Sequence, residues 1–287
     1  MFSDCSNLQS PCRITFRYVS GETINAYGFC NASGVSSLPS NMFSGTVGEL
    51  FLGQAFYKCT NLSSISSGAF NYTTNGGTQC NEMFYGCTSL LNVSGVTIPD
   101  IRNASGMFRN SGLTTITSSL FSDSSQCSSY AYCFSGCRNL RTAGSQGNPI
   151  TPPEHSVTVN INSMFENCSN LSTTEYAFGD VTVNKLGPTG RTDNSYIESG
   201  VLKHMNSCTD AFSGCSNMTS QPKWECIAVG VKLPTAYMPL FFYFEKLFQP
   251  YQFGFPDVDS LPKSGCFRGC TRMYNYADFN RYYPEWF

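Results

Sequence analysis

Residues 83–90 read MFYGCTSL, and residues 164–171 read MFENCSNL. The shared pattern Met-Phe-x-x-Cys-x-x-Leu returns along the chain, and aligning its phenylalanine gives nine copies spaced 27, 27, 28, 24, 26, 31, 47 and 55 residues apart. A unit of this size cannot close a hydrophobic core by itself, so the period predicts a stacked solenoid. The aligned residues are Phe2, Phe29, Phe56, Phe84, Phe108, Phe134, Phe165, Phe212 and Phe267.

The positions around this phenylalanine predict which side chains face inward. Cysteine stands three residues later in seven of the nine copies, and an apolar residue follows about three residues after that. Buried cysteine packs as a small hydrophobic side chain, so we expect a ladder of reduced thiols beside the phenylalanines. The predicted repeat core consists of Phe2, Cys5, Leu8, Phe56, Cys59, Leu62, Phe84, Cys87, Leu90, Phe134, Cys137, Leu140, Phe165, Cys168, Leu171, Phe212, Cys215, Phe267 and Cys270.

Two further features predict the local backbone. Gly, Asn and Asp dominate the position two residues after the phenylalanine, and these residues tolerate the left-handed conformation of a tight turn. A Leu-x-x-Ile step at 62–65 and at 113–116 predicts a short strand, and residues 157–161, VTVNI, also have the composition of a strand.

The recurring pattern resembles the BspA-like, or bacterial-surface-antigen, type of leucine-rich repeat, including its Met-Phe-rich subfamily. Residues 96–108, VTIPDIRNASGMF, look like the segment that leads into the motif in that subfamily. The resemblance implies a curved leucine-rich-repeat-like array, mainly β with short helical or irregular turns, and with a parallel sheet on one face. It also implies adhesion and protein binding at the surfaces of bacteria, protists and their viruses.

Departures from the period divide the chain. We expect a solenoid over 1–221 with insertions at 141–162 and 179–207, an aromatic-rich insertion or cap over 222–263, and the last repeat with a C-terminal cap over 264–287. The aromatic segment is predicted either to cover the end of the solenoid or to expose a binding surface. Its candidate binding residues are Trp224, Tyr237, Phe241, Phe242, Tyr243, Phe244, Phe248 and Tyr251.

Composition argues against several partners. The net charge is −2, only 13% of residues are charged, and the basic residues are scattered, so a nucleic-acid partner is not expected. No apolar run approaches the roughly 20 residues that cross a bilayer, so membrane insertion is not expected either.

Enzyme activity, a cofactor and a metal site are not expected. The chain has two histidines, His155 and His204, and neither lies in a recognisable catalytic motif. The two Cys-x-x-x-Cys spacings, at 133–137 and 266–270, are looser than a zinc knuckle and are explained by the repeat. Four cysteines do not fit the repeat and are the better candidates for a disulfide: Cys12, Cys30, Cys127 and Cys226.

Two functions remain open at this point. One is a non-enzymatic adhesion or recognition protein that binds a protein or glycan partner. The alternative is a structural subunit of a larger assembly such as a virion, tail or surface filament. No signal peptide is visible, and the location expected is a surface, the extracellular space or such an assembly. Because residues 1–2 already belong to the core motif, the expected homo-oligomer or assembly contact lies at the N-terminal end.

Overall fold

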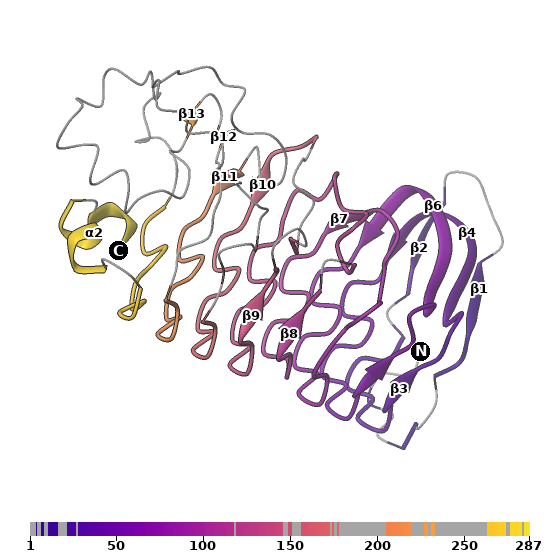
Figure 1. The fold of residues 1–287 in the computed structure, drawn as a ribbon. Helices are drawn as coiled ribbons and strands as arrows, with labels where there is room; N and C mark the ends of the chain where they lie inside the picture. Colours follow the sequence, from indigo (N-terminus) through magenta and orange to yellow (C-terminus); the bar gives the residue numbers. More distant parts are fainter. Residues whose placement is uncertain are drawn as a thin grey trace.

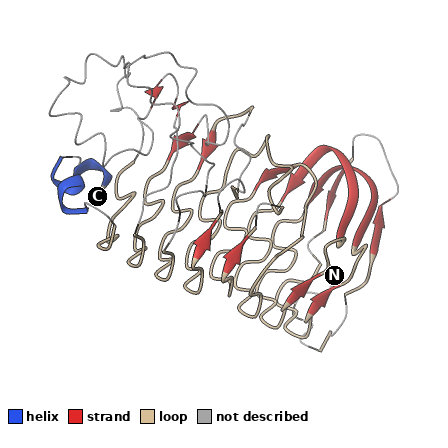
Figure 2. Ribbon diagram, in the orientation of Figure 1, coloured by secondary structure: helices blue, strands red, loops and turns tan. Residues whose placement is uncertain are grey.

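The chain is a mainly-β repeat solenoid with parallel strands, which confirms the predicted fold class (Figure 1). Successive coils stack along one axis, from the long strands near the N-terminus to a short helical segment near the C-terminus (Figure 2). The computed structural model describes residues 4, 7–8, 11–16, 22–26, 28–117, 119–145, 149–150, 156–172, 174, 177, 205–219, 227–228, 231–232, 263–273, 276–282 and 284–287.

One set of strands lies directly before the phenylalanine motif. The largest sheet has the order β1-β4-β6-β7, with β2 also paired to β4, and every pair in it is parallel. A second parallel pair, β10 and β11, occupies the same place in later coils. The bounds are β1 Ile14–Phe16, β2 Thr23–Asn25, β4 Phe43–Phe51, β6 Phe70–Gln79, β7 Ile101–Asn103, β10 Val159–Asn160 and β11 Met205–Ser207.

A second set of short strands follows the motif. The strands β3 (Ser37–Leu38) and β5 (Ser64–Ile65) form one parallel pair, and β8 (Thr115–Ile116) and β9 (Thr142–Ala143) form another. The strand predicted at the Leu-x-x-Ile step is therefore confirmed in both coils that suggested it.

The remaining elements lie toward the C-terminus. The strands β12 (Ile227–Ala228) and β13 (Val231–Lys232) form an antiparallel pair, the helix α2 spans Tyr276–Tyr282, and the 3-10 turn η5 spans Pro284–Trp286. No helix in the described part of the chain is long and apolar enough to span a membrane.

The predicted insertion at 141–162 is partly built into the coils. It begins with β9, which pairs in register with β8, and it ends with β10 inside the predicted strand 157–161. The N–H of Arg141 also donates to the carbonyl of Thr114 at 3.0 Å. The two ends of the interval 141–162 therefore belong to the repeat, because β9 and β10 each pair with a strand of a neighbouring coil.

In the copies that the structure describes in full, the phenylalanine motif forms no strand, yet its backbone is bonded to the next coil. The N–H of Phe56 donates to the carbonyl of Met83 at 2.9 Å, and the N–H groups of Gln54 and Lys58 donate to the next coil in the same way. The intervening Tyr57 N–H instead donates three residues back, to Gln54. Alternate N–H groups thus link coils and close turns, which satisfies the backbone without a sheet.

This alternation uses left-handed backbone on both sides of the phenylalanine. The residue two positions after it has positive φ in all nine copies, which confirms the prediction made from Gly, Asn and Asp. In the seven copies from Phe56 to Phe267, the residue two positions before it also has positive φ, which the sequence analysis did not predict. That second set is Gln54, Glu82, Gly106, Tyr132, Ser163, Asp210 and Gly265.

The phenylalanine rings form a continuous stack through the core. From Phe29 to Phe267, successive rings are stacked with centroids 5.3–5.7 Å apart, and each side chain is at most 2% exposed. Trp286 stacks on Phe267 at 5.9 Å, and its carbonyl accepts the N–H of that phenylalanine. Trp286 thus takes the place that a further repeat phenylalanine would fill.

The cysteines of the motif add a second ladder beside this stack. Each thiol donates to the carbonyl of the phenylalanine one coil earlier, at 2.9 Å for Cys59 to Phe29 and at 3.0 Å for Cys168 to Phe134. Burial raises the pKa of the Cys59 thiol to about 12, so the thiols stay neutral donors. The cysteines that bond in this way are Cys59, Cys87, Cys137, Cys168, Cys215 and Cys270.

Candidate functional site

In the coils of Phe56, Phe84 and Phe108, two positions of the motif carry half-buried or exposed side chains, with one glycine among them. They are the residue two positions before the phenylalanine and the residue one position after it. Together with the first of these positions in the coil of Phe134, they give six residues with long, aromatic or charged side chains and one glycine. We call this set the turn face, and it consists of Gln54, Tyr57, Glu82, Tyr85, Gly106, Arg109 and Tyr132.

Aromatic rings occupy one part of the turn face. Tyr57 and Tyr85 lie at the same position of consecutive coils and stack with centroids 4.7 Å apart and planes 12° apart. This distance matches the spacing of hydrogen-bonded neighbours in a parallel β-structure, so the backbone ladder sets it. The Lys58 ammonium lies 5.3 Å from the centroid of Tyr57, and the Asn110 amide donates to the Tyr85 hydroxyl at 3.1 Å.

Charged groups occupy the adjoining part. The Arg109 guanidinium lies over the ring of Tyr132, 4.9 Å from its centroid, and Tyr132 remains 41% exposed. The Gln54 amide donates to Oε2 of Glu82 at 2.7 Å. A cation over an aromatic face and a charge-assisted hydrogen bond both limit the motion of these side chains before any ligand arrives.

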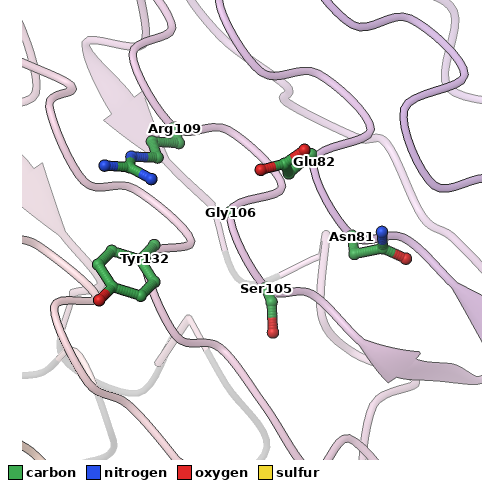
Figure 3. Close-up of a pocket in the computed structure, with 6 residues that line it drawn as sticks. All are labelled: Asn81, Glu82, Ser105, Gly106, Arg109 and Tyr132. Carbon is green, nitrogen blue, oxygen red and sulfur yellow. The ribbon is translucent and has the colours of Figure 1, made fainter.

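A hollow opens between these groups at Gly106, and side chains from three consecutive coils surround it (Figure 3). Its volume is about 180 Å³. The lining combines a carboxylate, a guanidinium, an amide, a hydroxyl and a phenol. The lining residues are Asn81, Glu82, Ser105, Gly106, Arg109 and Tyr132.

The binding residues predicted from the sequence lie elsewhere. The eight aromatic candidates from Trp224 to Tyr251 are outside the described residues, as are Phe2 and Cys5 of the predicted core. Leu8 is half-buried against the core, and the remaining predicted core residues, from Phe56 to Cys270, are buried.

The cysteines proposed for a disulfide have different environments. Cys12 is an exposed free thiol and Cys127 a buried free thiol, while Cys30 is half-buried and Cys226 is outside the described residues. Among the residues that the structure describes, no group of three or more His, Cys, Asp or Glu side chains could hold a metal ion.

The turn face was not predicted from the sequence, because the repeats were compared mainly at the inward positions around the phenylalanine. The same alignment places Tyr57, Tyr85 and Arg109 in one column, one residue after the phenylalanine. A glycine between Glu82 and Tyr132 in the other column was also visible. Comparing outward columns across neighbouring repeats would have identified the candidate surface.

Comparisons with known proteins give no independent assignment. No protein-family model matches the chain, no curated protein matches it, and no solved structure matches it.

Proposed function

We propose that this chain is a non-enzymatic recognition module that binds a protein or glycan partner through the turn face of its solenoid. The observation that carries the proposal is the fixed row of Tyr57, Tyr85, Arg109 and Tyr132 on consecutive coils. Tyrosine and arginine are the residue types that contribute most to binding energy at protein interfaces. An adhesion or recognition role at a surface accords with such a row.

The rigidity of the row supports binding. The tyrosine pair is held at 4.7 Å by the coil spacing, and Arg109 is held over Tyr132. Tyrosine has few rotatable bonds and supplies a large contact area at a small loss of conformational entropy. Binding to an ordered surface of this kind loses less side-chain conformational entropy, so more of the interaction free energy contributes to affinity.

The test is a binding screen with matched variants. The full chain would be titrated against an array of defined oligosaccharides and against a displayed peptide library, and each hit would be measured again with Tyr57→Ala, Tyr85→Ala and Leu91→Ala. Leu91 is 49% exposed and does not belong to the turn face, so its variant controls for general surface changes.

The expected result is at least one defined ligand whose affinity falls tenfold or more in Tyr57→Ala or Tyr85→Ala and is unchanged in Leu91→Ala. Each hit would also be measured with Tyr132→Ala, and ligands whose affinity is unchanged in all three tyrosine variants would overturn the proposal. The absence of any ligand from both panels would overturn it as well.

A further inference from the structure

The hollow at Gly106 arises from one substitution in a regular column. Glu82, Gly106 and Tyr132 hold the same position in three consecutive coils, two residues before the phenylalanine. All three backbone N–H groups donate to the next coil, at 2.8, 2.7 and 2.8 Å. The backbone is therefore the same at each coil, and the hollow exists because the middle coil has no side chain there.

The residues before and after Gly106 in this column keep a side chain although their backbone is left-handed, which is unfavourable. Glu82 has φ 53° and Tyr132 has φ 58°, close to the 63° of Gly106. A left-handed conformation costs an L-residue about 1–2 kcal/mol, and a bulky residue adopts it rarely. Non-glycine residues occur at this position in other coils too, so the strain alone marks no site. A glycine flanked by two long, polar-ended side chains does distinguish this one.

The lining is matched to a neutral ligand that carries many hydroxyl groups. One carboxylate, on Glu82, and one guanidinium, on Arg109, give the hollow no net charge. The Glu82 carboxylate would repel an anion, and the Arg109 guanidinium would repel a cation. Glu82 Oε2 already accepts from Gln54, and the Ser105 hydroxyl donates to Ser129 at 2.7 Å, so both side chains are oriented and keep acceptor capacity.

The ring of Tyr132 supplies the apolar part of the site. Arg109 lies over the ring, and 41% of the residue remains exposed. The face of an aromatic ring carries partial negative charge, and the C–H groups on one side of a pyranose carry partial positive charge. A sugar ring can thus pack against the part of the phenol that Arg109 leaves exposed, while its hydroxyls reach the surrounding amide, carboxylate and guanidinium groups.

We infer that this hollow binds one neutral hexopyranose residue of a glycan, an inference that rests on the proposed recognition function. The volume of about 180 Å³ lies below the roughly 300–1,000 Å³ of sites that enclose a drug-sized molecule. It accommodates a single ring, and the rest of the glycan extends over Tyr85 and Tyr57 along the turn face.

The experiment fills the hollow and uses a second glycine as its matched control. Gly106 has φ 63°, and a Cβ there would lie 3.1 Å from Cγ of Glu82, whereas Gly95 has φ 73° and its Cβ would meet only Ser67 at 3.6 Å. Asparagine tolerates the left-handed conformation, so Gly106→Asn and Gly95→Asn are comparable in backbone strain. Only the first places a side chain in the hollow.

Binding of methyl glucoside, methyl galactoside, methyl mannoside and their neutral oligosaccharides would be followed by NMR titration of the full chain. The expected result is binding of at least one of these probes, weakened tenfold or more by Gly106→Asn and by Tyr132→Ala and unchanged by Gly95→Asn. Circular dichroism and the urea midpoint establish that each variant is folded. If Gly106→Asn is unfolded, Glu82→Gln takes its place, because it keeps the side-chain volume and removes the charge.

Two results would overturn the inference and leave the recognition function standing. One is a ligand whose binding depends on Tyr57 and Tyr85 and is unaffected by Gly106→Asn. The other is a preference for sialic acid or glucosamine over all neutral sugars, because the hollow would then favour a charge. Failure of every probe in both this titration and the wider screen would remove the inference and the recognition function together.

Discussion

Replacing Phe134 by alanine tests the stacked core most directly. Its side chain is fully buried, it stacks between Phe108 at 5.7 Å and Phe165 at 5.4 Å, and it meets the edge of Phe121 at 6.1 Å. Truncating a buried phenylalanine to alanine costs about 3–5 kcal/mol through lost transfer energy and the cavity that remains. Because Phe134 joins the coils on both sides, the upper part of that range is expected.

A leucine variant separates ring stacking from simple burial. Phe134→Leu keeps much of the side-chain volume and loses the two stacked pairs. Each aromatic pair is worth about 0.5–1.5 kcal/mol beyond its buried area, so the expected loss is about 1–3 kcal/mol. The order of stability should therefore be wild type, then Phe134→Leu, then Phe134→Ala.

The assay is equilibrium unfolding in urea, followed by far-ultraviolet circular dichroism. Leu91→Ala serves as the control, because a change at a residue that is 49% exposed should alter stability by less than about 0.5 kcal/mol. A Phe134→Ala variant as stable as this control would refute the stacking register. A Phe134→Leu variant as stable as the wild type would show that the ring contacts contribute nothing beyond volume.

Three other predictions follow from the same core. Iodoacetamide should label Cys12 in the native chain and Cys168 only after denaturation, and peptide mass spectrometry that finds Cys168 labelled in the native chain would contradict its burial. Burial raises the pKa of Cys137 to about 11 and of Cys59 to about 12 from 9.0, so as the pH rises above 9.0 the unfolded chain loses these protons first. The free energy of unfolding should then fall by up to about 1.4 kcal/mol per pH unit for each thiol, and a urea midpoint that stays constant from neutral to alkaline pH would be the contrary result. Trp286→Ala should speed amide exchange in the last repeat and leave the central coils unchanged, because stability in a repeat array is mainly a sum over neighbouring units; uniform acceleration by mass spectrometry would exclude a local role.

The inward half of the repeat could be predicted from the sequence because each inward position accepts few residue types. Phenylalanine stands in all nine copies and cysteine beside it in seven, and both are buried around Phe84 and Phe165. The left-handed position after the phenylalanine was predictable for the same reason. Even Lys58, the exception in residue type, has φ 54° there.

The left-handed position before the phenylalanine could not be predicted in this way. Gln54, Glu82 and Tyr132 have no intrinsic preference for positive φ, so their residue types give no signal for it. Their conformation is imposed by the N–H groups that donate to the next coil, which is tertiary information. The hydrogen bonds donated by the Cys59 and Cys168 thiols could not be predicted for a related reason, since their acceptors lie a whole coil away.

The length of the strands near the N-terminus was also not anticipated. The strand β6 includes Gly76 and Gly77, residues that usually weaken a strand. A Cβ at Gly77 would lie 2.3 Å from Cγ of Arg102, so the side chain of the neighbouring coil fills that space. Arg102 is held there by a paired contact with Asp100 at 2.8 Å.

Backbone hydrogen bonds join the turn face to the next coil at each repeat. Stability and ligand recognition should therefore depend on different groups. Glu82, Gly106 and Tyr132 differ completely in side chain, yet each donates the same hydrogen bond to the next coil. Outward residues can therefore change without removing a link, whereas Phe134 cannot change without opening the stack. Substitutions in the turn face should alter ligand binding at nearly constant urea midpoint, and Phe134→Ala should lower the midpoint before it alters binding. A turn-face variant such as Tyr85→Ala that lost both together would mean that recognition and stability share the same contacts.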